Sequence, residues 1–385
     1  MLGNFTFHNP TKLYFGENAL EHLSQELGKY GEKVMLVYGG GFIRKNGIYD
    51  AVQAELRKAG KQTVELSGVM PNPTIEKVME GVALARKEAV DFILAVGGGS
   101  VCDYGKAVAG SAYCEHDPWE YYFNNFGEMT CRWIPVGCVL TMAGTGSEMD
   151  SCSVISKHSE NRKKFYYFRN PDFSILNPIY TYTVPKHHTV AGIYDIMSHI
   201  LEQYLSGTDD NTTDYIAEGL MRSLVVSSRK VLGNPDDYEA RSNIMWTATW
   251  ALNGLLACGK PTDWMGHMLG QAYTDATHGH TLSAVSGAYY RLLIGRSEEA
   301  VKKFRRLAEN VWGISSDGKT EKDIAVEGLL RMEEWMRDMG LAMNITACGA
   351  DASQLEGMAD ACPINESGYV VLTREDVIEV LRQSL

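Results

Sequence analysis

The clearest chemical signal in the chain is one carboxylate with three histidines. Asp195 and His199 lie four residues apart in AGIYDIMSHILEQYL, whose apolar spacing predicts a helix, so both side chains share one face. His267, in DWMGHMLG, and His278, in ATHGHTLSA, lie in or beside further helix-like stretches. One carboxylate and three imidazoles suit a divalent ion such as Fe²⁺ or Zn²⁺. The same residues also fit a salt bridge within a helix and buried core histidines, because three separate segments must converge to form a metal site.

A fourth histidine, His280, follows two residues after His278. An imidazole at this place can move a proton to or from a reacting group, or it can cap the start of a helix. Both interpretations stand on the sequence alone. We take His280 as the candidate catalytic residue.

A glycine-rich turn gives the strongest nucleotide signal. Gly97-Gly98-Gly99-Ser100 follows the apolar stretch 91–96 and precedes a helix-like stretch at 101–112. Glycines let the backbone approach a phosphate, and a helix N-terminus offers unpaired N–H groups. A tight turn without a ligand is the alternative. Asp103 and Lys106 follow in the first turns of that helix, either as polar ligand contacts or as a dipole partner and a surface lysine.

Two more loops are candidates for the cofactor. Gly39-Gly40-Gly41, with Arg44 and Lys45 nearby, follows the predicted strand 33–38 and could lie beside an adenosine ribose. The hydroxyl-rich loop 140–149 offers Thr141 and Thr145 to phosphates or to a carboxamide, or serves only to cap a short helix. Neither glycine turn completes GxGxxG, and the P-loop pattern is absent from the sequence, so a standard dinucleotide or P-loop site is excluded.

The elements that must position these residues change in kind along the chain. Before about residue 184, apolar runs at 33–38, 62–66, 91–96, 133–140 and 173–176 alternate with helical stretches at 48–59, 74–89 and 101–112. This alternation predicts a parallel sheet covered by helices. The charged run Glu160–Lys164 is predicted to be an exposed turn, although a lysine there could reach a phosphate. The later part is predicted to be helical at 189–205, 212–232, 237–258, 283–294, 297–312, 322–340, 351–361 and 374–384.

Composition narrows the function classes. The 385 residues carry a formal net charge of −12, which disfavours nucleic-acid binding. Eight scattered cysteines form no CxxC pair, and no apolar run reaches the length of a membrane span, about 18 residues or more. With no signal-peptide pattern at MLGNFTFHNP, we expect a cytoplasmic protein without a membrane or nucleic-acid partner.

Taken together, these motifs resemble the iron-containing (group III) alcohol dehydrogenase family, nearest its butanol dehydrogenase and broad aldehyde reductase branch. The resemblance rests on FTFHNPTKLYFGENAL, YGGGFIRKNG, MPNPT, AVGGGSVCDYGKAVA, LTMAGTGSEMDSCSVIS, FSILNP, TYTVP, AGIYDIMSHILEQYL, ALNG, DWMGHMLG and THGHTLS, and so covers nearly the whole chain. It implies a dehydroquinate synthase-like fold. We therefore expect an α/β dinucleotide-binding domain at 1–182 and an all-helical metal-binding domain at 183–385.

The resemblance also assigns residues. It implies that one divalent metal, Fe²⁺ or Zn²⁺, is bound by Asp195, His199, His267 and His278. It implies a cofactor site with the pyrophosphate at the second glycine turn and further contacts from the other loops. The residues of that site are Gly39, Gly40, Gly41, Asn72, Gly97, Gly98, Gly99, Ser100, Asp103, Thr141, Thr145 and Lys163.

Two departures from the family pattern bear on chemistry. Gln271 occupies a position where many relatives carry a histidine near the nicotinamide, which makes His280 the replacement candidate for proton transfer. Gly40 stands where NAD-preferring members often carry aspartate, which favours NADP(H) over NAD(H) and places Arg44 or Lys45 near the 2′-phosphate.

The resemblance implies hydride transfer between NAD(P)H and a small aldehyde or primary alcohol, with the metal polarising the carbonyl. A homodimer or larger homo-oligomer is also expected. The alternatives are a polyol dehydrogenase of the glycerol type or a sugar-phosphate cyclase on the same fold, or a non-catalytic nucleotide-binding relative.

Overall fold

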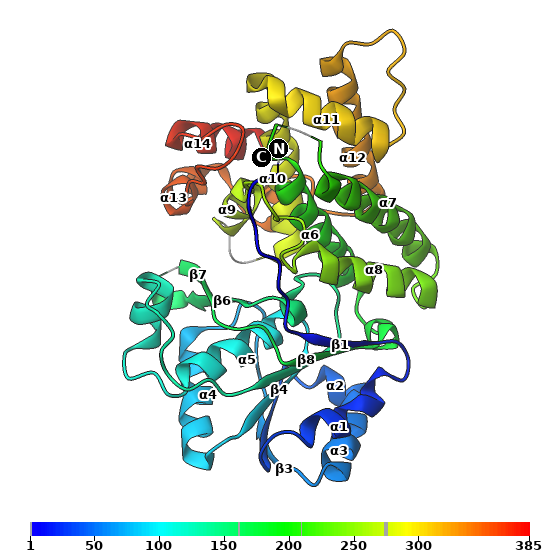
Figure 1. The fold of residues 1–385 in the computed structure, drawn as a ribbon. Helices are drawn as coiled ribbons and strands as arrows, with labels where there is room; N and C mark the ends of the chain where they lie inside the picture. The colour runs from blue at the N-terminus through cyan, green and yellow to red at the C-terminus, as the bar shows by residue number, and fades with distance from the viewer. Residues whose placement is uncertain (1, 161, 209, 273–275) are drawn as a thin grey trace. The chain divides into compact units, whose positions relative to one another are not determined.

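The computed structural model describes residues 2–160, 162–208, 210–272 and 276–385, which form two compact units (Figure 1). One unit is His8–Val184, and the other combines Pro185–Leu385 with residues 2–7. The first residues therefore differ from the expected division of the chain, since Gly3 donates its N–H to the Gly259 carbonyl at 2.7 Å. This backbone contact attaches the N-terminal segment to the helical unit.

The first unit is built on a six-stranded sheet in which every neighbouring pair is parallel, in the order β1-β8-β5-β4-β2-β3. All residues of β4 and β5 are buried, which explains why these strands read as unbroken apolar runs. The strands are β1 (Lys12–Phe15), β2 (Lys33–Tyr38), β3 (Gln62–Leu66), β4 (Phe92–Gly97), β5 (Val136–Leu140) and β8 (Phe173–Leu176).

Helices connect these parallel strands, as the alternation of patterns predicts. Thr74 caps α4 by accepting the Lys77 N–H, and Ala89 ends that helix in a left-handed conformation. The helices are α1 (Leu23–Leu27), α2 (Phe42–Lys45), α3 (Ile48–Lys58), α4 (Ile75–Glu88) and α5 (Gly99–Ser111). Shorter turns of helix lie at Ala19–His22, Trp119–Asn124, Ser147–Met149, His158–Glu160 and Pro178–Thr181.

A separate hairpin corrects one sequence expectation. β6 (Cys152–Lys157) pairs antiparallel with β7 (Arg162–Tyr167), so an exposed turn at 162–164 is wrong. The three basic residues that open β7 hid its strand character, while Phe165, Tyr166 and Tyr167 supply the aromatic side chains that strands favour. Asn161, within that predicted turn, lies outside the described residues.

Among its described residues, the second unit contains helices joined by loops and no strand. Asn211, Thr320 and Thr373 each begin a helix with a reciprocal capping box. The predicted helix 237–258 ends early, at Ala251, because Gly254 adopts a positive φ of 92° and starts a turn. The helices are α6 (Lys186–Tyr204), α7 (Thr212–Gly233), α8 (Tyr238–Ala251), α9 (Met265–Gln271), α10 (His278–Arg296), α11 (Glu298–Asn310), α12 (Glu321–Met339), α13 (Leu355–Ala361) and α14 (Arg374–Gln383), with 3₁₀ turns at Thr346–Cys348 and Ala352–Gln354.

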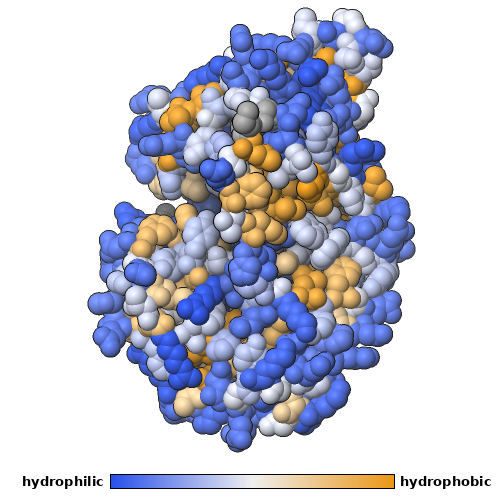
Figure 2. Space-filling view, in the orientation of Figure 1, coloured by the Kyte–Doolittle hydropathy of each residue, from blue (hydrophilic) through white to orange (hydrophobic). Residues whose placement is uncertain are grey.

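The surface is mixed in character. Figure 2 shows one face that is mostly polar, with smaller apolar patches between the charged side chains. Exposed large apolar residues include Val226, Trp246 and Leu330. None of the described helices is long and apolar enough to span a lipid bilayer.

Candidate metal centre and cofactor loops

Helix α6 supplies two of the four predicted metal ligands. Every residue from Val190 to Tyr204 is buried on this helix, so Asp195 and His199 lie away from solvent. Their i and i+4 positions bring His199 Nε2 within 3.8 Å of Asp195 Oδ1. The carboxylate and the first imidazole are thus placed by one helix.

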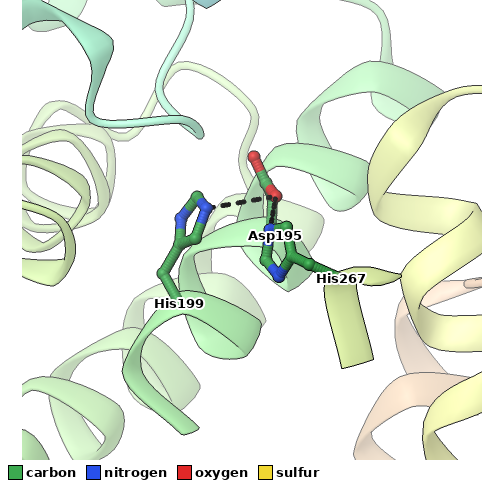
Figure 3. A group of neighbouring side chains, drawn as sticks. All are labelled: Asp195, His199 and His267. Carbon is green, nitrogen blue, oxygen red and sulfur yellow. Dashed lines mark ion pairs between the residues drawn. The ribbon is translucent and has the colours of Figure 1, made fainter. Parts of the chain in front are cut away.

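The other two histidines come from α9 and α10. His267 Nε2 and His278 Nε2 each lie 3.7 Å from Asp195 Oδ1. All three imidazoles therefore surround one carboxylate oxygen, and Figure 3 shows His199 and His267 directed toward Asp195. Asp195, His199 and His267 alone already form a group whose ligand atoms lie within 4.8 Å of one another. Two ligands of one tetrahedral ion are separated by roughly 3.4 Å, so a shared cation fits here.

Unpartnered atoms test whether a cation belongs in this cluster. Within the described part of the chain, Asp195 Oδ1 and His267 Nε2 are buried and accept or donate no hydrogen bond. Leaving a buried polar atom without a partner costs about 1–3 kcal/mol. A divalent cation would satisfy both atoms together, so the residues fit a metal ion.

The electrostatics of the cluster keep Asp195 ionised and His199 neutral, which are the forms that bind a metal ion. Burial raises the pKa of Asp195, but the surrounding imidazoles outweigh burial and lower this pKa well below its ordinary value. Burial lowers the pKa of His199 to about 4, which leaves its imidazole neutral. Burial also lowers the pKa of His267, but the carboxylates of Glu202 and Asp195 prevail and raise it to about 9. A proton on His267 therefore competes with a cation for this site.

Both ring nitrogens of His280 form hydrogen bonds with backbone groups. Its Nδ1 accepts the N–H of Ala342 at 3.2 Å, so Nε2 carries the proton and donates to the His187 carbonyl at 3.2 Å. The ring also stacks on that of His187, with centroids 4.1 Å apart. Both ring nitrogens thus connect segments distant in sequence. This geometry favours a structural role over the proton transfer expected from sequence.

The glycine turn at 97–100 joins β4 to α5. A Cβ at Gly99 would lie 2.1 Å from Thr145 Oγ1, so only glycine leaves room for the adjacent loop. Thr141 donates its backbone N–H to the Gly97 carbonyl at 2.9 Å. No side chain among the described residues caps α5. The structure thus brings the predicted residues Gly97–Ser100, Thr141 and Thr145 together at the N-terminus of a helix.

Asp103 and Lys106 support the neighbouring loop from inside. The two oxygens of Asp103 accept the Ser147 hydroxyl and, at 3.0 Å, the Val154 N–H. Lys106 is fully buried, and its Nζ donates to the Ser147 carbonyl at 2.9 Å and to Asp150 Oδ1 at 2.7 Å. Lys106 is therefore no surface lysine, and Asp103 uses its carboxylate to hold the loop that carries Thr145.

The remaining predicted cofactor residues fall into two places. Asn72 adopts a left-handed φ of 52°, and the next residue, Pro73, accepts the Ser156 N–H, while Lys163 pairs with Ser156 across the hairpin. The turn at Asn72 and the strand with Lys163 are therefore neighbours. Gly39, Gly40 and Gly41 follow β2, and Gly41, with a φ of 95°, begins α2.

Arg44 already has side-chain partners, so it is less available to pair with a 2′-phosphate than the sequence suggests. Its Nη2 donates to Glu65 Oε2 at 2.6 Å and to the Tyr38 hydroxyl at 2.6 Å, and its guanidinium lies 3.7 Å from the Tyr49 ring centroid. Lys45 is exposed. Of the two basic residues expected near a 2′-phosphate, Arg44 would have to leave a carboxylate partner.

Sequence reasoning missed Glu202. This residue follows His199 by three positions on α6, is 2% exposed and contacts His267. A second acidic residue on a mostly apolar helix, three residues after a predicted ligand, was the available signal, because buried carboxylates require partners.

Comparison with known proteins identifies the family to which this chain belongs. Residues 10–178 match the family described as iron-containing alcohol dehydrogenase, and residues 189–385 match the C-terminal domain of the same family. The protein therefore belongs to the iron-containing alcohol dehydrogenase family and is an oxidoreductase.

Individual relatives are similar along nearly the whole chain. The probable NADH-dependent butanol dehydrogenase 1 of Bacillus subtilis is 38% identical, covering 99% of this chain and 100% of the relative. The NADPH-dependent aldehyde reductase YqhD of Escherichia coli is 35% identical over 93% and 92% of the two chains. The crystal structure of an NADH-dependent butanol dehydrogenase A from Thermotoga maritima superposes with a TM-score of 0.93 at 34% identity, covering 100% and 99%.

Proposed function

We propose that the protein transfers a hydride reversibly between NAD(P)H and a small aldehyde or primary alcohol, using Fe²⁺ or Zn²⁺. The observation that carries this proposal is the cluster of three imidazoles around the single unpartnered oxygen of Asp195. Asp195, His199, His267 and His278 would hold the metal. When bound, a divalent cation supplies Lewis-acid polarisation of a carbonyl oxygen.

The protein's own residues bind and orient the cofactor. The N-terminus of α5, with Gly97–Ser100, offers backbone N–H groups to the pyrophosphate. Thr141 and Thr145 line the loop beside this turn, and Asp103 keeps that loop in place through Ser147. Gly39–Gly41, Asn72 and Lys163 complete the proposed cofactor site.

The proton route avoids His280. Because both ring nitrogens of His280 bond to backbone groups, we propose that His280 moves no proton and that water would deliver it. The His278 side chain is 26% exposed, which gives water a way to the ligand cluster.

NADPH is the proposed preferred cofactor. A Cβ at Gly40 would meet no atom within 4 Å, so there is space for a 2′-phosphate at this position. An aspartate here, as NAD-preferring members often carry, would repel that phosphate. Lys45 is exposed nearby to neutralise the 2′-phosphate. Relatives of both preferences are similar to this chain, so the cofactor ratio must be measured.

The experiment compares kcat/KM for NADPH and NADH on butyraldehyde, for the wild type and for Gly40→Asp. We expect the wild type to favour NADPH and Gly40→Asp to lower the NADPH to NADH ratio at least about tenfold, equivalent to about 1.4 kcal/mol. A wild type that favours NADH, with no response to Gly40→Asp, contradicts the cofactor proposal. A panel of aldehydes from two to eight carbons defines the substrate class.

We also propose a cytoplasmic homo-oligomer. All eight cysteines are free thiols, as in a reducing compartment. Light scattering during gel filtration tests the assembly, since a monomer at all concentrations would contradict it.

A further inference from the structure

Glu202 directs both of its carboxylate oxygens to one metal-ligand residue. Oε1 accepts the backbone N–H of His267 at 2.6 Å, and Oε2 bonds to Nδ1 of the same residue. The carboxylate reaches from α6 to α9 and is almost completely buried. The two helices that supply Asp195 and His267 are thus joined at the ligand itself.

This contact determines which ring nitrogen of His267 can bind a metal. A carboxylate only accepts hydrogen bonds, so Nδ1 must carry the proton that it donates to Glu202. In the neutral ring, the form that can bind a metal, the lone pair then resides on Nε2, the buried atom that has no partner and lies 3.7 Å from Asp195 Oδ1. Ring orientation and tautomer are fixed together.

Neighbouring residues pack tightly around Glu202. A Cβ on Gly266 would lie 2.7 Å from Glu202 Oε1, so the carboxylate occupies the space that any side chain at 266 would need. Asp263, also buried, fastens the start of α9 by donating its N–H to the Glu202 carbonyl at 2.8 Å and accepting the Met265 N–H at 3.0 Å. The Tyr289 hydroxyl donates to the other oxygen of Asp263.

We propose that Glu202 is a positioning residue for metal binding, which holds His267 with Nε2 free for the ion, and that Gly266 provides the space for this carboxylate. The inference rests on the proposed metal role of His267. Glu202 acts through His267 and contacts neither metal nor substrate.

Glu202→Gln is the direct test. A glutamine amide has one acceptor and one donor group, so its NH2 would face either the backbone N–H or the Nδ1 proton of His267, and one of the two hydrogen bonds would be lost. Measured by competition with a chelator, Zn²⁺ affinity should fall about 10- to 100-fold. Gly266→Ala, which displaces the carboxylate without removing it, should lower affinity in the same direction. Asp263→Asn is the matched control, because it alters a buried carboxylate that does not touch a ligand; it should lower the melting temperature while folded protein keeps Zn²⁺ affinity within about threefold.

Proton NMR gives a readout without metal. The wild type should show the far-downfield resonance of an imidazole–carboxylate hydrogen bond, Asp263→Asn should keep it and Glu202→Gln should lose it. Folded Glu202→Gln with wild-type Zn²⁺ affinity, or with that resonance intact, would overturn the inference. A wild type that shows the resonance but binds neither Zn²⁺ nor Fe²⁺ refutes the proposed function and, with it, a positioning role toward metal.

Discussion

Residue types alone identify the four candidate ligands, but contacts decide what each histidine does. Asp195 and His199 were predictable because helical spacing places them on one face. The role of His280 was not, since its ring bonds to His187 and Ala342, which lie 93 and 62 residues away in the chain. Side-chain partners at such separations leave no local sequence pattern.

Replacing His280 should affect stability rather than proton transfer. His280→Ala removes two partly buried hydrogen bonds and leaves the Ala342 N–H without its acceptor, which costs about 1–3 kcal/mol. Denaturant unfolding should show this loss, while the pH dependence of kcat remains that of the wild type at permissive temperature. If the pH profile of the variant lacked an ionisation that the wild type shows, His280 would be a proton-transfer residue.

Asp195 should be decisive for metal retention, because its Oδ1 is the atom shared by all three imidazoles. Asp195→Asn preserves shape and removes the charge, so metal affinity should fall on the order of 100-fold or more. Asp214→Asn is the control: this buried aspartate pairs with Lys260 and Lys303 instead of histidines. Elemental analysis after dialysis should find metal in the control and little in Asp195→Asn; equal retention contradicts the ligand assignment.

At the scale of elements, apolar periodicity predicted regular helices and strands, but it did not predict the long-range side-chain contacts that hold the loops. Strands β2, β3, β4, β5 and β8 and helices α3, α4 and α5 follow from apolar periodicity, and the buried runs of β4 and β5 were especially clear. The short elements β1, β6, α1 and α2 were not predicted. The hairpin strand β7 was missed because basic residues open it. Lys106, for which the sequence left a ligand contact and a surface position open, is buried because Asp150 and the Ser147 carbonyl compensate its charge, and both lie more than 40 residues later.

Removing the Lys106 charge should therefore destabilise the first unit. Lys106→Met leaves Asp150 buried beside an apolar side chain, which costs about 3–5 kcal/mol. The double variant with Asp150→Asn should recover part of this loss, as a double-mutant cycle of unfolding free energies would show. Strict additivity of the two single changes would contradict the pairing.

The link between β1 and α1 should make stability sensitive to acid. Burial raises the pKa of Glu26, but hydrogen bonds from Lys12, Lys29 and Tyr14 outweigh burial and lower it from 4.5 to about 2. This carboxylate therefore stabilises the fold above pH 4.5, and the contribution is lost as pH falls through about 2.

Comparing wild type with Glu26→Gln isolates that contribution. Since both lysines are largely exposed, we expect a difference of about 1–2 kcal/mol in unfolding free energy at pH 7, which shrinks steadily below pH 4.5. A difference that stays constant down to pH 2 would show that the carboxylate charge is not the cause.

At the scale of the whole molecule, the change from alternating to purely helical patterns was enough to predict two units of different class. The sequence did not reveal that residues 2–7 belong with the helical unit, because this depends on contacts between distant residues, such as the hydrogen bond from Gly3 to Gly259. The two family models match residues 10–178 and 189–385, which correspond closely to the alternating and the helical unit.

The most direct test of this account is anaerobic turnover of butyraldehyde with NADPH, by protein first stripped of metal and then reloaded separately with Fe²⁺ and Zn²⁺. We expect no oxidation of NADPH by the stripped protein and restored turnover with at least one of the two ions. Undiminished turnover by the metal-free protein, or none after reloading across the aldehyde panel with either NADPH or NADH, would contradict it.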